Sequence, residues 1–159
     1  MPIFTEEFTS KVAPSKLFQA GAVDSHNLIP KLMPEAVSSA TLLVGDGGVG
    51  TVKLFKFTDV VPYDSLKERV ELLDKENLEY THSWIEGGLL GAKLQSATYN
   101  IKIHPGADGG SVIKITVDYQ PKPGAELTEA DINADKEESY GVFQAVEAYL
   151  LANPGVYAA

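Results

Sequence analysis

Cysteine is absent from the 159 residues, and so are several other features that would assign the chain to a particular class of protein. Without cysteine there is no disulfide framework, no thiolate metal site and no thiol nucleophile, which is typical of a reducing compartment. No stretch approaches the ~18 consecutive apolar residues of a membrane span. The first residues show no basic segment followed by an apolar run. We therefore expect a cytoplasmic protein without a membrane span.

Positive charge is also scarce, with 13 Lys and Arg against 22 Asp and Glu and a formal net charge of -9. An acidic surface repels phosphate backbones, which disfavours nucleic acid as a partner. The three histidines, His26, His82 and His104, lack any paired metal-ligand spacing, so we expect neither a metal site nor a cofactor. The length predicts one domain over residues 1–159, and the dispersed negative charge favours a soluble monomer.

Two short helices are predicted after a first strand. Pro14 suits the first turn of the first helix, which continues through 16–20. The second helix, over 25–33, is expected to be capped by Ser25 and limited by Pro30 and Pro34. This pattern predicts a V of two short helices.

Strand signals occupy the middle of the chain. In 111–119 apolar and polar side chains alternate, so one face is expected to be buried and the other wet. The loops at 74–77 and 108–110 are too short for parallel crossovers and predict antiparallel pairing. The expected strands, including the first, are 3–12, 40–44, 51–57, 65–73, 78–85, 94–103 and 111–119.

A long helix is predicted over Glu129–Ala152, because Thr128 and Asp131 form a start resembling a capping box and no proline interrupts the segment. One stripe of this helix is polar in its first half and apolar in its second. Either the polar half lines a space, or it faces solvent where the helix overhangs the sheet. The stripe comprises Asp131, Asp135, Glu138, Val142, Val146 and Tyr149.

A glycine-rich loop satisfies the pattern GxGxxG, which in dinucleotide-binding folds precedes a helix. Here the next segment, 51–57, alternates as a strand, and no Gly-Lys-Ser/Thr sequence closes the loop. We therefore interpret the loop as a hairpin connection and leave open whether its backbone N–H groups bind an anion. Its residues are Gly45, Asp46, Gly47, Gly48, Val49 and Gly50.

Four motifs in register resemble the pathogenesis-related class 10 proteins of the Bet v 1-like (birch pollen major allergen) family. They are the glycine-rich loop 45–53, the second glycine motif 85–88, the hairpin 108–115 and the helix end 145–153. The resemblance implies an α+β helix-grip fold. In this fold a seven-stranded curved antiparallel sheet wraps around the long C-terminal helix, with two short helices between strands 1 and 2 and an internal cavity.

The resemblance implies a set of ligand-contacting positions, two of which depart from the usual family pattern. Position 82 more often carries tyrosine and position 138 an apolar residue, so this cavity is expected to be more polar and more sensitive to pH. The implied positions are Ile29, Val37, Phe57, Tyr63, Tyr80, His82, Tyr99, Ile101, Ala134, Asp135, Glu138, Ser139 and Val142. The two-residue period of the strands adds Lys53, Phe55 and Leu66 to the expected ligand-binding residues. The same inward faces also hold Glu68, Val70, Trp84 and Ile103, which are not counted in that set.

The function implied is that of an intracellular plant defence or stress carrier, which binds small apolar or amphipathic metabolites or hormones such as cytokinins and flavonoids. An enzyme acting on a plant metabolite is one alternative, with Lys53, Tyr80, His82 and Glu138 as possible groups. A weak ribonuclease is another, because that activity is proposed for the family. The weak catalytic candidates are then Lys53, Glu147 and Tyr149, but position 95 is Gln, which cannot act as a general base.

Overall fold

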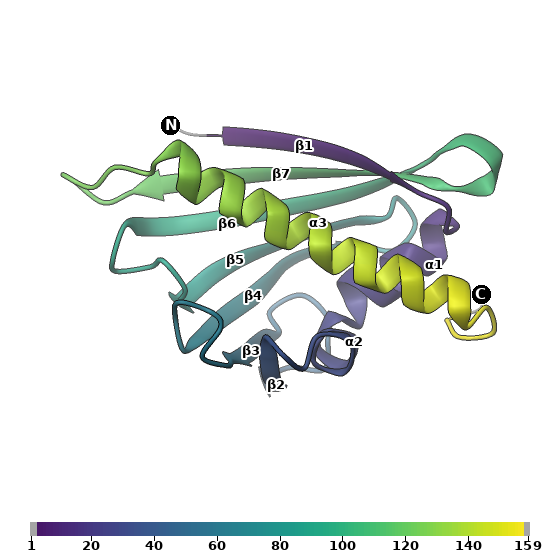
Figure 1. Cartoon of the computed structure of the whole chain (residues 1–159), viewed down its shortest axis with the longest axis horizontal. Coiled ribbons are helices and arrows are strands. Elements are labelled where there is room, and N and C mark those ends of the chain that lie inside the picture. Colours follow the sequence, from purple (N-terminus) through teal and green to yellow (C-terminus); the bar gives the residue numbers. More distant parts are fainter. Residues whose placement is uncertain (1–2, 158–159) are drawn as a thin grey trace.

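The structure is a computed structural model that describes residues 3–157. Its strands and helices follow the expected order, with a π-helical turn (η1) after α1 and a short 3-10 turn (η2) before the last strand (Figure 1). The elements are β1 (Ile3–Ser10), α1 (Pro14–Phe18), η1 (Gln19–Val23), α2 (Ser25–Leu32), β2 (Val37–Val44), β3 (Val52–Phe57), β4 (Ser65–Asp74), β5 (Glu79–Gly87), β6 (Leu94–Pro105), η2 (Ala107–Gly109), β7 (Ser111–Pro121) and α3 (Glu129–Ala152).

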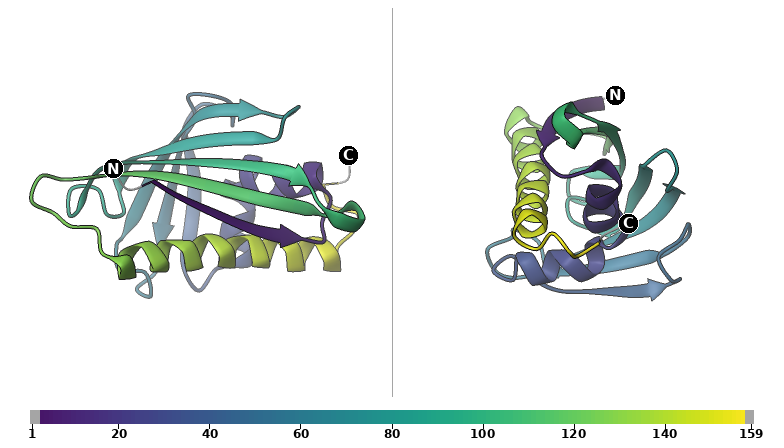
Figure 2. Two further views of the ribbon diagram at one scale, coloured as in Figure 1. Left: turned by 90° about the horizontal axis from the view of Figure 1, so that it is seen from above. Right: turned by 90° about the vertical axis from the view of Figure 1, so that its right-hand side faces the viewer.

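The strands form one antiparallel sheet in the order β1-β7-β6-β5-β4-β3-β2. From β2 to β7 each strand pairs with its neighbour in sequence, whereas β1 pairs with β7 at the edge of the sheet. The sheet curls toward one side, α3 runs along its concave face, and α1 and α2 lie near the carboxyl-terminal end of α3 (Figures 1 and 2). This architecture confirms the predicted α+β helix-grip fold.

Alternation along the strands orients the side chains of the sheet. In β7 the side chains of Ile113, Ile115, Val117 and Tyr119 are buried, as the period of two predicts. The same rule holds in β6, where Tyr99 is among the buried residues. These faces point toward α3 and form the main core.

Helix α3 begins as predicted. The Thr128 side chain accepts a hydrogen bond from the Asp131 amide, and the Asp131 carboxylate accepts one from the Thr128 amide. Lys93 also reaches this end and donates to the Asp131 carboxylate at 2.7 Å. The helix then runs for 24 residues to Ala152.

The two short helices differ from expectation in three ways. Asp24 is the N-cap of α2, and Ser25 is its first helical residue, because the Ser25 hydroxyl accepts a hydrogen bond from Lys53 and does not cap the helix. Pro30 lies inside α2 and does not end it, since the helix continues to Leu32. The turn η1 was not foreseen. Gly21 in this turn lies so close to α3 that an added Cβ would come within 2.8 Å of the Phe143 ring.

Candidate functional site

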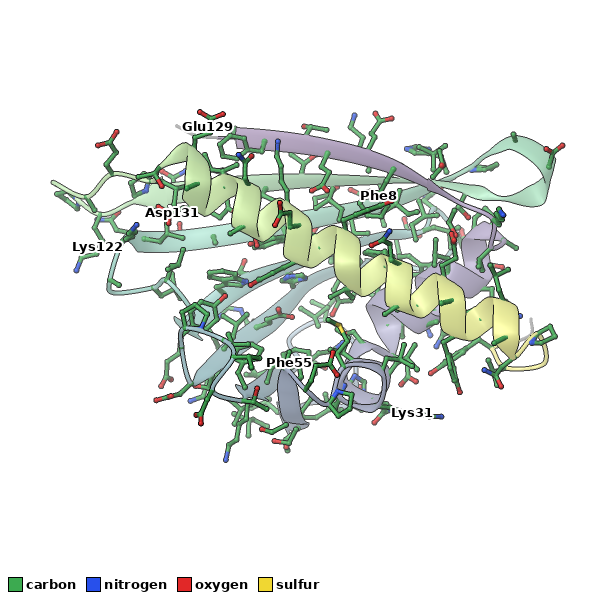
Figure 3. The ribbon with its side chains drawn as sticks, in the orientation of Figure 1. Phe8, Lys31, Phe55, Lys122, Glu129 and Asp131 are labelled. Atoms are coloured by element: carbon green, nitrogen blue, oxygen red, sulfur yellow. The ribbon has the colours of Figure 1, made fainter. Side chains whose placement is uncertain are left out.

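A cavity of about 250 Å³ lies between the concave face of the sheet and α3, with α2 and its neighbouring segments at one side. Phe55 reaches from β3 into the region below α3, whereas Asp131 lies near the amino-terminal end of that helix (Figure 3). Most of the expected ligand-contacting residues line this cavity, although their contact with a ligand stays a prediction. They are Ile29, Val37, Phe55, Phe57, Tyr63, Leu66, Tyr80, His82, Tyr99, Ile101, Asp135, Glu138, Ser139 and Val142.

Two of the expected residues do not belong to the lining. Ala134 is exposed on α3, one helical step before Asp135, which faces inward. Lys53 is fully buried but turns its ammonium group toward the short helices. Adjacent residues of a helix point in directions about 100° apart, so the Ala134 side chain can face solvent while the Asp135 side chain faces the cavity.

Lys53 connects β3 to the segment that joins α1 and α2. Its Nζ donates to the Ser25 hydroxyl at 3.0 Å and to the carbonyls of Val23 and Ala22 at 3.3 and 3.4 Å. The ammonium group also lies 5.4 Å from the centre of the Tyr80 ring. Burial lowers the pKa of Lys53 to about 8, although the negative charges of Glu68 and Asp24 act to raise it. These contacts give Lys53 a structural part in holding the short helices against the sheet.

A row of aromatic rings forms the wall opposite α3. His82 and Tyr99 are direct cross-strand partners on β5 and β6, and their rings stack with centroids 5.0 Å apart and planes 12° apart. Trp84 lies against the Tyr99 ring at 5.5 Å and 23°, and Tyr80 meets the edge of His82 at 5.8 Å. The result is a flat surface suited to a planar ligand.

Burial sets the charge of His82. Desolvation lowers the pKa of this imidazole, and the attraction of Glu68, whose carboxylate lies 3.6 Å from Nε2, opposes the shift. His82 is therefore neutral at pH 7. Its Nδ1 and the Tyr80 hydroxyl are buried without a hydrogen-bond partner in the described part of the chain. Both can still bond to a bound molecule.

Asp135 is the centre of a polar cluster at the amino-terminal half of α3. The hydroxyls of Tyr99, at 2.7 Å, and Tyr119 both donate to its Oδ2 atom. Burial raises the pKa of Asp135, although the two phenols oppose the shift. Glu138 lines the same cavity but is also exposed to solvent, and partial desolvation raises its pKa, with the charge of Asp135 adding to that effect. Two carboxyl groups with raised pKa values thus face one cavity, an arrangement typical of functional sites.

Some of the lining was absent from the ligand-contacting positions named from the sequence. Glu68 and Trp84 were placed on inward faces by strand periodicity, and the same signal could have included them in the site. Val61 and Met33 lie in loops, where no periodicity indicates direction. The remaining additions are Gly21, Ala22, Ser25, Ala36, Ile115 and Phe143.

The glycine-rich loop connects β2 to β3 as a hairpin, as interpreted from the sequence. Gly45, Gly47 and Gly50 have φ values of 82°, 116° and 91°, which L side chains rarely adopt. The Gly47 amide donates to the Thr51 hydroxyl at 2.9 Å, and the Gly50 amide donates to the Val70 carbonyl at 2.8 Å. At least these two amides are therefore already engaged within the protein.

The residues considered for ribonuclease activity have separate partners. The Glu147 carboxylate accepts from the backbone amide of Lys11 at 3.2 Å, and the Tyr149 hydroxyl accepts from Lys31 at 2.9 Å. Lys53 is buried beneath the short helices, and Gln95 is exposed on β6. These side chains therefore form no common hydrogen-bonded centre.

Two kinds of feature are absent from residues 3–157. No group of three or more histidine, aspartate or glutamate side chains in this range is arranged to hold a metal ion. No helix in the same range has the length and apolar character needed to cross a membrane.

Comparison with known proteins agrees with this architecture. The sequence model of the pathogenesis-related protein Bet v 1 family matches residues 3–153. The chain belongs to the Bet v 1 family. It is 45% identical to the major allergen Pru ar 1 of Prunus armeniaca over 159 residues, which cover 99% of each chain.

Solved structures share the Bet v 1 fold. The crystal structure of Ara h 8.0201 matches with a TM-score of 0.85 and 34% identity, over 96% of this chain and 99% of that chain. The structure of norcoclaurine synthase from Thalictrum flavum matches with a TM-score of 0.79 and 23% identity, over 94% and 86%. The second likeness shows the common fold alone.

Proposed function

We propose that this Bet v 1 family member is an intracellular carrier of small, largely apolar plant metabolites or hormones, of the size and flatness of cytokinins and flavonoids. The observation that carries the proposal is the cavity of about 250 Å³ lined by aromatic and aliphatic side chains with a few polar groups. Such a composition is typical of small-molecule sites. The absence of cysteine fits a reducing cytoplasm, and the net charge of -9 favours a monomer.

The expected affinity is moderate. A ligand that buries about 300 Å² of apolar surface gains ~7.5 kcal/mol at ~25 cal/mol/Å². Association removes several kcal/mol of that gain. Dissociation constants near micromolar or weaker follow, which suits a carrier or buffer of abundant metabolites.

Displacement of a neutral cavity dye such as Nile red tests the proposal. We expect saturable uptake at one site and competition by cytokinins or flavonoids at micromolar concentration, without formation of a product. Ser139→Phe should abolish dye uptake because Ser139 lines the cavity, whereas Ala134→Phe on the exposed face should leave it unchanged. Equal uptake by both variants, or no uptake by the wild type, would contradict the proposal.

Catalysis on a bound metabolite is a second candidate, favoured by the polar cluster. Asp135, with its raised pKa and two phenol partners, can exchange a proton with a ligand, and the neutral His82 imidazole lies on the same wall. Under this alternative, incubation with candidate substrates yields product, and Asp135→Asn abolishes turnover while dye uptake persists. Turnover that survives Asp135→Asn would exclude this role for Asp135.

A further inference from the structure

The charged side chains on the cavity wall are of one sign. Glu68, Asp135 and Glu138 line the cavity, and the described lining contains neither lysine nor arginine. The nearest buried cation, Lys53, donates to Ser25 and two backbone carbonyls and is attracted by Glu68, so only Asp135 and Glu138 are lining carboxylates without a lysine or arginine close by in the described part of the chain. An apolar cavity with unbalanced carboxylates favours a positively charged guest and disfavours a negative one.

The carboxylates at α3 retain capacity for further hydrogen bonds. The Tyr99 and Tyr119 hydroxyls both donate to Oδ2 of Asp135, which leaves Oδ1 available. Within residues 3–157, Glu138 forms no side-chain hydrogen bond or ion pair, although it lines the same cavity and lies close enough to Asp135 for their charges to interact. A primary ammonium group has three donors and can serve both carboxylates.

A second observation, independent of the acidic groups, also indicates a ligand. The Tyr80 side chain is 2% exposed, lines the cavity, and has a hydroxyl without a partner in the described part of the chain. A buried phenol without a partner is unfavourable until another polar group reaches it. The stacked rings of His82, Tyr99 and Trp84 complete an aromatic wall next to the carboxylates. Tyrosine and tryptophan faces attract cations.

We infer that the cavity selects amphipathic aromatic amines in their protonated form. The ammonium group binds at Asp135 and Glu138, and the planar body lies along the aromatic wall toward the apolar side of the cavity. The inference rests on the proposed carrier function and adds a preference for ligand charge. A neutral analogue of the same shape binds more weakly, and a carboxylate analogue binds most weakly.

Three small molecules with one ring system and different head groups provide the test. Tryptamine carries an ammonium group, tryptophol a hydroxyl in the same place, and indole-3-propionate a carboxylate. Each is titrated against the Nile red complex at pH 7 and low salt. We expect tryptamine to displace the dye at a concentration at least tenfold lower than tryptophol, and indole-3-propionate to be weaker again.

Matched variants locate the effect on the helix. Glu138→Gln and Asp135→Asn should each reduce the preference for tryptamine over tryptophol by at least threefold. Glu137→Gln changes the net charge by the same amount at an exposed neighbouring position outside the lining, and it should leave the preference unchanged. Nile red affinity of each variant verifies that the cavity remains formed.

The outcomes separate the two proposals. Equal displacement by the three molecules, stronger binding of the carboxylate, or no displacement by any of them overturns the charge preference while dye uptake still supports a carrier. An equal loss of preference in Glu137→Gln assigns the effect to the overall charge and also overturns the inference. Failure of the wild type to take up dye contradicts the carrier function itself.

Discussion

The two halves of α3 cross the same sheet but meet different surroundings. The amino-terminal part, as far as Phe143, lies along the cavity and directs Asp135 and Glu138 toward it, whereas the carboxyl-terminal part buries Val146 and Leu150, which are each 1% exposed. One half therefore lies over a hollow and the other over a packed core. Polar residues with raised pKa values occur where packing is incomplete. One part of α3 therefore contributes to the ligand site and the other part to the core.

The largest expected effect tests the packed half. Leu150→Ala should lower the free energy of unfolding by about 2–5 kcal/mol, because Leu150 is 1% exposed within the core and does not line the cavity. Val142→Ala, at the cavity wall on the same helix, should lower it by less than about 1.5 kcal/mol, since its neighbours already adjoin empty space. Urea denaturation measures both, and similar values would contradict the division of the helix.

The next effect concerns the attachment of the short helices near the packed half. Lys53→Met should lower the free energy of unfolding by about 1–3 kcal/mol, because it leaves the Ser25 hydroxyl and two carbonyls without their buried donor. Chemical denaturation at pH 7 measures the change. No loss of stability would show that Lys53 does not hold the short helices.

Lys53 also predicts a dependence on pH. Its pKa is lowered in the native protein, so the unfolded chain binds more protons between about 8 and the ordinary 10.5. The contribution of Lys53 to stability should therefore rise with pH across that window. The difference in unfolding free energy between wild type and Lys53→Met should widen there. Using this difference cancels the ionisation of tyrosines that both proteins share.

A smaller effect is expected at the start of the cavity half. Thr128→Ala removes the side chain that accepts from the Asp131 amide and should lower stability by about 1 kcal/mol. Amide hydrogen exchange should accelerate in the first turn of α3 and stay unchanged around Leu150. Uniform acceleration along the helix would show that the two halves unfold as one unit.

The smallest effect has the opposite sign. Partial burial raises the pKa of Glu138, which also contacts solvent, so its ionised form destabilises the native state slightly at pH values above that pKa. Glu138→Gln should therefore raise the melting temperature at pH 7. The gain should disappear below the ordinary pKa of a glutamate, where the carboxyl is protonated in both folded and unfolded states. Glu137→Gln is the matched control, and an equal gain in that variant would assign the effect to net charge.

Sequence patterns located the elements of the fold, whereas ligand contact by the expected site residues stays a prediction. The bounds of α3 were predicted correctly because Thr128 and Asp131 act locally, within one helical turn. The buried face of β7 was also predicted, since strand alternation depends on the backbone alone. Ala134 was named as a ligand-contacting position from the family resemblance, but it is exposed and outside the lining, because the rotation of a helix about its axis depends on what it packs against.

The sequence by itself determined the order of strands and helices, the antiparallel meander, the hairpin at the glycine-rich loop and the acidic surface, because these follow from local periodicity, turn chemistry and composition. Only the tertiary structure decided that Tyr99 and Tyr119 share the Asp135 carboxylate and that Lys53 bonds to the short helices. Contacts between residues distant in sequence depend on how the sheet curls and where the helix lies across it. The same geometry leaves a cavity under one half of α3 and a packed core under the other.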